Sequence, residues 1–272
     1  MRKRMTDAAR EADKGDNDRQ FVTALYRGLE ILRAFSPNDR AGLGNSDLAE
    51  RTGLPNSTVS RLTFTLLKAG YLVYDDDTGR YRMGVPVLSL GYACLAGLHV
   101  RETAQVYMQK LADDCGDGVL VALGGRDDMS MTYISCARSV GVISLQLDVG
   151  SRISLARSAI GRAYIAGTHD AERRDIIERI RQRTEPDKLN QILEGIDDAR
   201  EQIATRGFYT SIKEWQKDVH AVSVPYRSPQ PDTPMLAFNL GGYSFSLPKE
   251  RLEQELGPKL VELVNTVSRV GY

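Results

Sequence analysis

The pattern of apolar and polar residues near the N-terminus predicts three helices. Residues 21–35 repeat apolar side chains at the spacing of one helix face, and we expect that face to be buried. Its members are Leu25, Leu29 and Leu32. A short second helix is expected over 46–52. A third begins at Asn56 or Ser57, either of which suits a helix N-cap, and ends before Gly70.

Two short runs of β-forming residues follow the third helix. YLVY (71–74) and RYRM (80–83) flank DDDTG, which is rich in turn-forming residues. They predict a two-stranded hairpin. Residues 21–84 therefore have the element order of a winged helix-turn-helix, in which the third helix enters the DNA groove and the hairpin is the wing.

The rest of the chain predicts a different kind of domain. A mostly apolar linker helix is expected over 85–100, packed on a second copy or on the next domain. A helix over 101–114 follows. Strands are then expected in GVLVALGG, SMTYISC and GVISLQL and, after three further helices, in FYTSIKE, HAVSVPY and MLAFNLGG; a last helix begins at Pro248. About six strands with partly segregated helices indicate an α+β domain over 101–272.

Composition narrows the class of protein. The chain has 272 residues, which suits two domains, and its 36 Lys and Arg balance 36 Asp and Glu. DNA affinity must therefore come from individually placed cations. The charged residues 1–20 predict a disordered arm rather than a signal peptide, and no apolar run is long enough to span a membrane. We expect a cytoplasmic protein.

Catalytic and metal chemistry finds no support in the sequence. The three cysteines form no CxxC pair, which favours neither a disulfide framework nor a zinc site. The three histidines are far apart, and the motifs HExxH, GxSxG and GxxxxGK[ST] are absent. We expect no catalytic residue, no metal and no cofactor.

The face of the third helix that lies opposite its apolar residues carries the candidate DNA contacts. Arg61 lies where a guanidinium can reach guanine, and Phe64 either contacts a thymine methyl or packs beneath the hairpin; we favour packing. The candidates are Asn56, Ser57, Thr58, Ser60, Arg61 and Lys68 on this helix, Arg80 and Arg82 on the hairpin, and Arg27 on the first helix. A merely solvated face is the alternative, which the matching elements around the helix disfavour.

Together these segments resemble the IclR family of bacterial transcriptional regulators. The matching runs, over about residues 21–270, are RGLEIL, SDLAERTGLPNSTVSRLTFTLLKAGYLVYDDDTGRYRMG, DVGSRISLARSAIGRAYIAG, RGFYTSIKEWQKDVHAVSVPY and AFNLGGYSFSLPKERL. The resemblance implies a winged helix-turn-helix, a linker helix and a GAF-like mixed α/β effector domain. It also implies a homodimer or tetramer that binds a palindromic operator beside catabolic genes. Phe64 departs from the smaller residue of the family pattern.

The resemblance also implies an effector site in the second domain. Ser158 would begin a helix whose free N–H groups favour an anion, so we expect a small organic acid, aromatic acids included. The expected site residues are Ser158, Ala159, Ile160, Ser211, Ala221, Asn239 and Gly241, with Val142 and Leu145 as apolar walls and Trp215 and His220 close by. The alternative is a DNA-binding protein whose second domain serves oligomerisation only.

Overall fold

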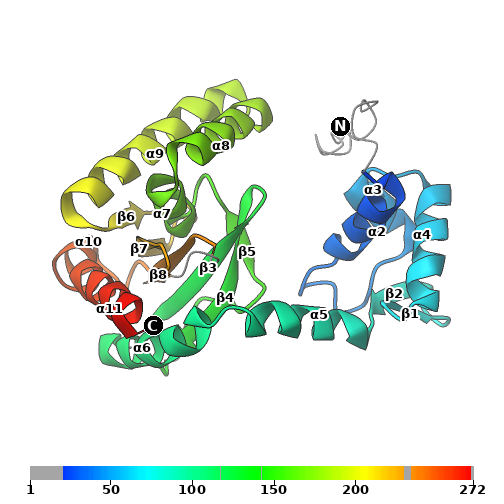
Figure 1. The fold of residues 1–272 in the computed structure, drawn as a ribbon, viewed down its shortest axis with the longest axis horizontal. Coiled ribbons are helices and arrows are strands. Elements are labelled where there is room, and N and C mark those ends of the chain that lie inside the picture. The colour runs from blue at the N-terminus through cyan, green and yellow to red at the C-terminus, as the bar shows by residue number, and fades with distance from the viewer. Residues whose placement is uncertain (1–20, 117, 142, 230–233, 271–272) are drawn as a thin grey trace. The chain divides into compact units, whose positions relative to one another are not determined.

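The computed structural model describes residues 21–116, 118–141, 143–229 and 234–270. It divides between Cys94 and Leu95 into two compact units, which are drawn from blue to teal and from green to red in Figure 1. The expected arm over 1–20 and the candidate Val142 lie outside the described residues.

The first unit has the predicted order of three helices and a hairpin. Its elements are α2 (Thr23–Arg33), α3 (Asn45–Thr52), α4 (Asn56–Lys68), β1 (Leu72–Asp75) and β2 (Arg80–Met83). Gly53 occupies the turn between α3 and α4, where the backbone φ is 72°. This conformation is costly for residues other than glycine. The helices and hairpin enclose a small core of Ile31, Leu43, Leu48, Leu54, Val59 and Leu72.

The buried face of α2 differs from the prediction. Leu25 and Leu29 are 63% and 50% exposed, whereas Ile31 is fully buried. The apolar residues of this helix therefore lie on two different surfaces. Leu32 of the predicted stripe packs against the core of the unit, as expected, whereas Leu25 and Leu29 face outward.

An ion pair fixes the connection between α2 and α3. Both terminal nitrogens of Arg51 donate to the carboxylate of Asp39 at 2.7 Å, and the same carboxylate accepts bonds from the N–H and hydroxyl of Ser36. Hydrogen bonds from Arg51 and then Ser36 hold the pKa of Asp39 far below its usual value of 3.8.

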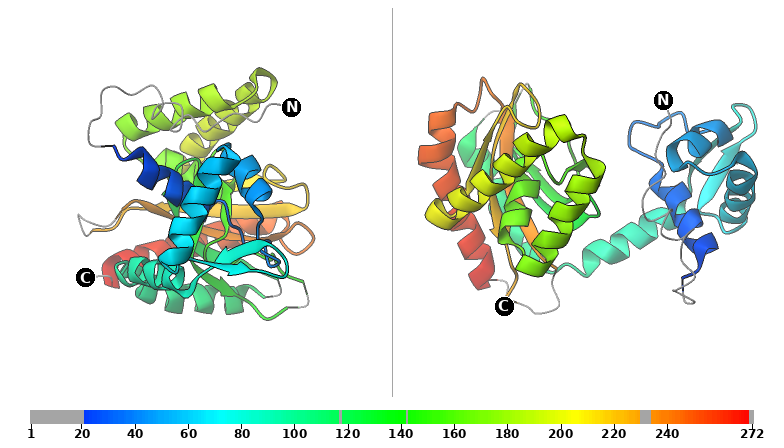
Figure 2. Two further views of the ribbon diagram at one scale, coloured as in Figure 1. Left: turned by 90° about the vertical axis from the view of Figure 1, so that its right-hand side faces the viewer. Right: turned by 90° about the horizontal axis from the view of Figure 1, so that it is seen from above.

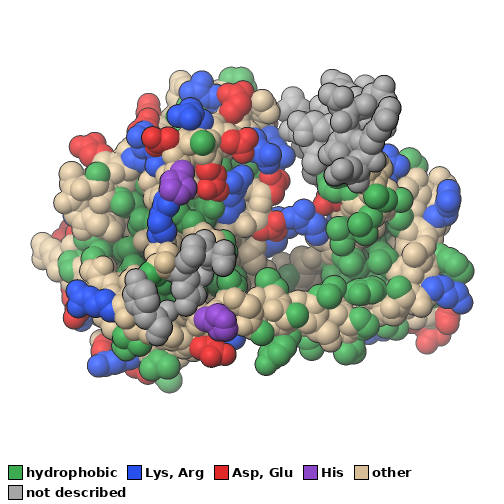
Figure 3. Space-filling model, viewed as in Figure 1, with side chains coloured by type: hydrophobic (Ala, Val, Ile, Leu, Met, Phe, Trp, Pro, Cys, Tyr) green, Lys and Arg blue, Asp and Glu red, His purple; other side chains and the backbone are tan. Residues whose placement is uncertain are grey.

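Helix α5 (Val85–Ala96) has no buried residue among those described. Four of its large apolar side chains, Val85, Leu88, Leu90 and Tyr92, are more than half exposed. Figure 3 shows hydrophobic side chains gathered along this helix. The predicted apolar helix begins where expected but ends at Ala96, before the predicted end at residue 100, and Val100 instead begins α6.

The second unit is a six-stranded antiparallel sheet between two layers of helices. Its elements are α6 (Val100–Cys115), β3 (Leu120–Asp127), β4 (Ser130–Arg138), β5 (Arg152–Ser154), α7 (Ala159–Gly167), α8 (Asp170–Arg183), α9 (Pro186–Arg206), β6 (Tyr209–Ile212), β7 (Val219–Tyr226), β8 (Leu236–Tyr243), α10 (Lys249–Arg251), η1 (Leu252–Leu256) and α11 (Gly257–Val270). The strand order is β5-β4-β3-β8-β7-β6. Helices α6 and α11 cover one face, and α7, α8 and α9 cover the other (Figure 2).

Two elements of this unit differ from the prediction. The run GVISLQL forms no strand in its described residues, and Arg152–Ser154 pairs with β4 at the sheet edge instead. The alternating leucines of that run face the space above the sheet rather than a neighbouring strand. The final helix contains a π-helical turn over Leu252–Leu256, just before Pro258, whose missing N–H removes a regular helical bond.

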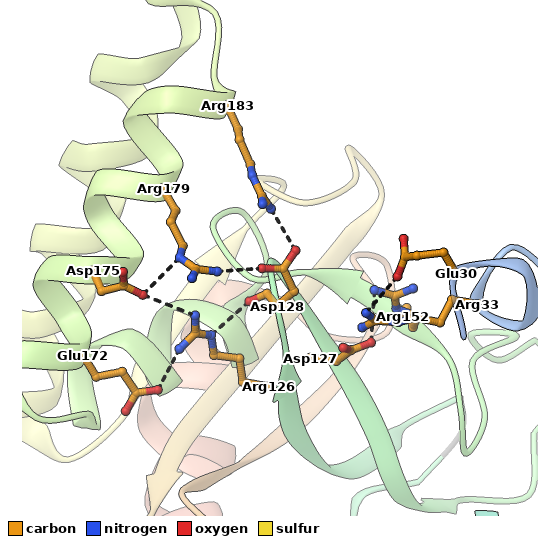
Figure 4. Close-up of polar contacts among 10 residues, drawn as sticks. All are labelled: Glu30, Arg33, Arg126, Asp127, Asp128, Arg152, Glu172, Asp175, Arg179 and Arg183. Atoms are coloured by element: carbon orange, nitrogen blue, oxygen red, sulfur yellow. Dashed lines mark hydrogen bonds and ion pairs between the residues drawn. The ribbon is translucent and has the colours of Figure 1, made fainter. Parts of the chain in front are cut away.

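Ion pairs hold α8 against the β3–β4 hairpin. Asp128, at the hairpin tip with a φ of 52°, accepts bonds from Arg179 at 3.1 Å and Arg183 at 2.8 Å (Figure 4). Arg126 on β3 reaches Glu172 of α8 at 2.9 Å. These contacts tie the hairpin to the helical layer above the sheet.

A buried arginine joins α7 to the loop after β6. Arg162 is 3% exposed and donates to the carbonyl of Ala156, to the hydroxyl of Tyr209 and to Glu214. The hydroxyl of Tyr209 also donates to Glu214 at 2.8 Å, and burial raises the pKa of this phenol. A Cβ on Gly195 of α9 would collide with the guanidinium. Helices α7 and α9 and the 213–218 loop are thus held around one charge.

We expect Asp39→Asn to destabilise the first unit by about 1–2 kcal/mol, because the bonds to Arg51 lose their charge partner. Since the folded pKa of Asp39 is depressed, its contribution is present above about pH 4 and is lost as the pH falls below that value. Urea unfolding from pH 7 to pH 3 measures both effects. The control Asp76→Asn alters an exposed wing carboxylate. Equal stability of the Asp39 variant and wild type at pH 7 would contradict this assignment.

We expect Glu214→Gln to destabilise the second unit by about 1–3 kcal/mol, since it leaves the buried guanidinium of Arg162 without an opposite charge. The lower part of this range allows for the 33% exposure of the Glu214 side chain. Trp215 is the only tryptophan, so its emission reports the loop directly. The emission should shift to the red and become easier to quench with acrylamide. The control Glu250→Gln, on an exposed surface residue, should change neither property.

Candidate functional site

The outward face of α4 is exposed along its whole length. Val59 and Thr63 turn into the unit and are fully buried. The exposed residues of the opposite face are Asn56, Ser57, Ser60, Arg61, Phe64 and Lys68, while Thr58 is half-buried. The structure therefore brings the candidates on this helix together on one surface. Arg27 lies half-buried on α2, outside this face.

The start of α4 differs from the prediction in its cap. Pro55 occupies the N-cap position, and its carbonyl accepts bonds from the N–H groups of Thr58 and Val59. Asn56 and Ser57 are the first two helical residues, so their side chains do not cap the helix. The first N–H groups of a helix have no partner within it, and they can bind a phosphate.

Ser60 and Phe64 differ from the expected candidates in their surroundings. The hydroxyl of Ser60 donates to the carbonyl of Asn56 and accepts a bond from the side chain of Asn45 at 2.6 Å, so it connects α3 and α4. The expectation that Phe64 packs beneath the hairpin is wrong, because its ring is 60% exposed. Thr63 instead faces the hairpin, with its hydroxyl 3.4 Å from that of Tyr81.

Both hairpin arginines are paired with carboxylates. Arg80 donates to the carbonyl of Gly42 at 2.8 Å and to Asp47 at 3.2 Å. Arg82 donates to Asp75 at 2.6 Å across the hairpin. These contacts brace the hairpin against the loop before α3. The side chains of Arg80 and Arg82 are still 40% and 55% exposed, so the remaining donors of each guanidinium are accessible to a phosphate.

A cavity lies between the second unit's sheet and the start of α7. Its volume is about 350 Å³, including the part that is open to solvent. The lining residues are Tyr133, Leu145, Leu147, Ile153, Ser158, Ala159, Ser211, Trp215, Val219, Ala221, Asn239 and Gly241. Eight of the eleven candidates from the sequence are among them.

The cavity exists because small residues meet in register on three adjacent strands. Ser211 of β6 pairs with Ala221 of β7, which pairs with Gly241 of β8. This row leaves space over the sheet. Helix α7 can approach from above because Gly161 fits against the backbone of Leu155, where a Cβ would collide. The row forms the floor of the cavity.

Two of the candidates turn away from the cavity. His220 lies between Val219 and Ala221, both of which line it, so the pleat directs His220 to the opposite face. There its Nδ1 lies 2.8 Å from the carbonyl oxygen of Leu247. Ile160 is fully buried, and its side chain packs in the core beside Gly124. The same alternation could have identified Val219 from the sequence.

Sequence reasoning also missed Tyr133, Leu147 and Ile153. Tyr133 follows the inward alternation of β4, but its distance in sequence from the other candidates gave no signal. Leu147 is two residues after Leu145 in the run that was expected to form a strand. Ile153 belongs to a strand of only three residues, too short for a periodic pattern.

The polar groups of the cavity are neutral. Ser158 caps α7 through its bond from the N–H of Gly161, which leaves the N–H groups of Ala159 and Ile160 as the first of the helix. Asn239 accepts a bond from Ser223 at 2.7 Å, which turns its amide nitrogen toward the hydroxyl of Tyr133. Burial raises the pKa of Tyr133, so the phenol stays protonated. No charged side chain is among the described lining residues.

The site thus combines hydrogen-bond donors at one end with an apolar wall. Leu145, Leu147, Ile153, Val219 and Trp215 supply the wall. Such a cavity suits a small molecule with an apolar body and an acceptor or anionic group. Within the described part of the chain, no helix is both long and apolar enough to cross a lipid bilayer.

Comparison with known proteins identifies both units. Residues 24–76 match the IclR helix-turn-helix domain, and residues 92–269 match the C-terminal domain of the bacterial transcriptional regulator IclR. The chain is 32% identical to the HTH-type transcriptional regulator TsaQ1/TsaQ2 of Comamonas testosteroni, over 91% of this chain and 87% of the relative. It is 27% identical to the Pca regulon regulatory protein of Pseudomonas putida, over 92% and 84% of the two chains.

A solved structure agrees with this result. The crystal structure of an IclR family transcriptional regulator from Brucella abortus is 43% identical, covers 94% of each chain and superposes with a TM-score of 0.83. The helix-turn-helix unit and the mixed α/β unit with its cavity correspond to the two matched domains. The chain therefore belongs to the IclR family of DNA-binding bacterial transcriptional regulators.

Proposed function

We propose that this regulator binds a palindromic operator of a catabolic operon as a homo-oligomer and responds to a small organic acid held in the cavity of its second unit. The observation that carries the ligand assignment is the meeting of the α7 N-terminus with the apolar wall around Trp215. The helix supplies free N–H groups for a carboxylate, and the wall supplies contacts for a ring or short chain.

Neutral donors suit this ligand class. A carboxylate at the start of α7 would be within the reach of groups that line the same cavity, among them Ser211 and Tyr133, whereas the hydroxyl of Ser158 already donates to the carbonyl of Ser154. Because no cationic side chain is among the described lining residues, the acid would be held by hydrogen bonds and the helix dipole rather than by an ion pair. A structural relative from Microbacterium hydrocarbonoxydans was crystallised with 4-hydroxybenzoate, but its 19% identity supports the fold alone.

The exposed face of α4 supports the proposed DNA contact. Arg61 lies one turn from Ser57 at the helix start, where a guanidinium can bond to guanine in the major groove. Lys68 lies two turns further along and suits a backbone phosphate. The N–H groups of Asn56 and Ser57 suit another phosphate.

Two exposed apolar surfaces support a homo-oligomer. Helix α5 exposes Val85, Leu88 and Tyr92 by more than 70% each, and α2 exposes Leu25 and Leu29. Apolar surfaces of this kind mark contacts with another protein. A palindrome requires two recognition helices about 34 Å apart, or a multiple of that distance. An acid that favours one arrangement of the subunits would change this spacing and hence the affinity for DNA.

We expect Arg61→Ala to lower specific operator binding by about 1–3 kcal/mol and to relax the preference at one base pair of each half-site. Gel-shift titration of the full chain on operators with single base changes measures both effects. Arg40→Ala removes an exposed arginine outside α4 and should leave base preference intact. If the Arg61 variant kept wild-type discrimination at every base pair, Arg61 would have no part in reading the sequence.

We expect Ala221→Leu to abolish acid binding, because the larger side chain rises from the cavity floor. Trp215 fluorescence, titrated with benzoate, other aromatic acids and short aliphatic acids, measures binding directly. The wild-type signal should saturate with at least one acid and respond more weakly to its carboxamide, since the amide lacks the charge. Ala171→Leu adds the same atoms on the surface of α8 and should bind like wild type. Saturable binding to the Ala221 variant would place the acid elsewhere.

A further inference from the structure

Phe64 is an exposed aromatic side chain at the centre of the DNA-facing surface of α4. The residue is 60% exposed and is not among the side chains that form the core of its unit. The ammonium group of Lys68 lies 5.5 Å from the ring centroid. A large apolar ring loses favourable burial when it stays in water, so a partner that covers it on binding would gain that burial.

The position of Phe64 on the helix selects DNA as this partner. At about 100° per residue, Ser57, Arg61, Phe64 and Lys68 fall within one stripe that is roughly 60° wide. Cationic Arg61 and Lys68 lie on either side of the ring along the helix. Because this charge complements phosphate, the polyanion that binds them also covers Phe64.

The major groove offers one apolar group to such a ring. Base edges there present donors and acceptors, with the C5 methyl of thymine as the apolar exception, and a phenyl ring can neither donate nor accept a conventional hydrogen bond. Insertion of apolar side chains between base pairs is a minor-groove mode. Phe64 lies about 4.5 Å beyond Arg61 along the helix axis, against a base-pair rise of about 3.4 Å.

We propose that Phe64 is a specificity-determining residue whose ring packs on the methyl group of a thymine, one or two base pairs from the base that Arg61 contacts. The proposal rests on the proposed function, namely that α4 enters the major groove. It assigns to Phe64 the preference for thymine at one position of each half-site.

The test removes the methyl group from the DNA without changing its pairing. Operator duplexes are made with deoxyuridine in place of each thymine in turn, and the full chain is titrated on every duplex. Replacement of the contacted thymine, which occurs once in each half-site, should weaken binding of wild type to the duplex about fourfold. This fold-change corresponds to about 0.8 kcal/mol for one buried methyl-sized group. Every other replacement should have a smaller effect.

Variants assign that effect to Phe64. Phe64→Ala should bind the thymine and deoxyuridine duplexes equally well at that position, and Phe64→Leu should restore part of the difference. The matched control Val73→Ala alters a side chain that is 55% exposed on β1, and it should keep the full wild-type difference. Since Phe64 is exposed, circular dichroism of its variants should match wild type.

The outcomes separate this inference from the proposed function. If wild type protects the operator but no deoxyuridine effect disappears in Phe64→Ala, the inference is overturned and DNA binding by α4 stands. If Phe64→Ala instead changes the oligomeric state in sedimentation, the ring covers a second copy and the inference is also overturned. If wild type binds no duplex even at low salt, the proposed function fails and the inference fails with it.

Discussion

The alternation of side chains along β6, β7 and β8 is the constraint on which the second unit depends. On one face, Ser211, Ala221 and Gly241 meet in register and leave the floor of the cavity open. On the other face, Val222 and Leu240 fill the core beneath α6 and α11. A shift of one residue in the register would exchange these faces, closing the cavity and emptying the core. The packing that stabilises the unit therefore also keeps the cavity open.

Helix α7 and the loop after β6 complete that site from above. Arg162 holds the loop through Glu214, and the next residue, Trp215, forms part of the cavity wall. Neither Arg162 nor Glu214, whose ion pair stabilises this arrangement, lines the cavity. The proposed acid would therefore meet neutral groups and no competing carboxylate among the described lining residues.

The sequence predicted the first unit well because its signals are local. Gly53, the hairpin turn and the helical spacing of α4 each fix a neighbouring segment. The exceptions are exposed apolar residues. The sequence predicts packing for Leu25, Leu29 and Phe64, but all three are exposed. Periodicity indicates a face of a helix but not whether that face meets the core of the unit or solvent.

In the second unit, the sequence predicted most strands and most of the cavity residues. The predictions were wrong where the pairing of strands distant in sequence determines the structure. The run over 141–147 alternates like a strand, yet the edge of β4 is taken by Arg152–Ser154. His220 is expected near the site because it is close in sequence to the other candidates, but strand alternation directs it to the face opposite Ala221. Tyr133 lines the cavity because the order of the strands in the sheet brings β4 close to it, and no local sequence pattern indicates that order.

The proposed regulation requires acid binding and DNA binding to be coupled through one protein. The most direct measurement determines the acid affinity by Trp215 fluorescence with and without operator, and the operator affinity with and without saturating acid. Coupling requires the ratio of the two acid affinities to equal the ratio of the two operator affinities. We expect each ratio to be about 5 to 150. Acid that binds in the cavity with the same affinity whether or not operator is present, and leaves operator binding unchanged, would contradict the account.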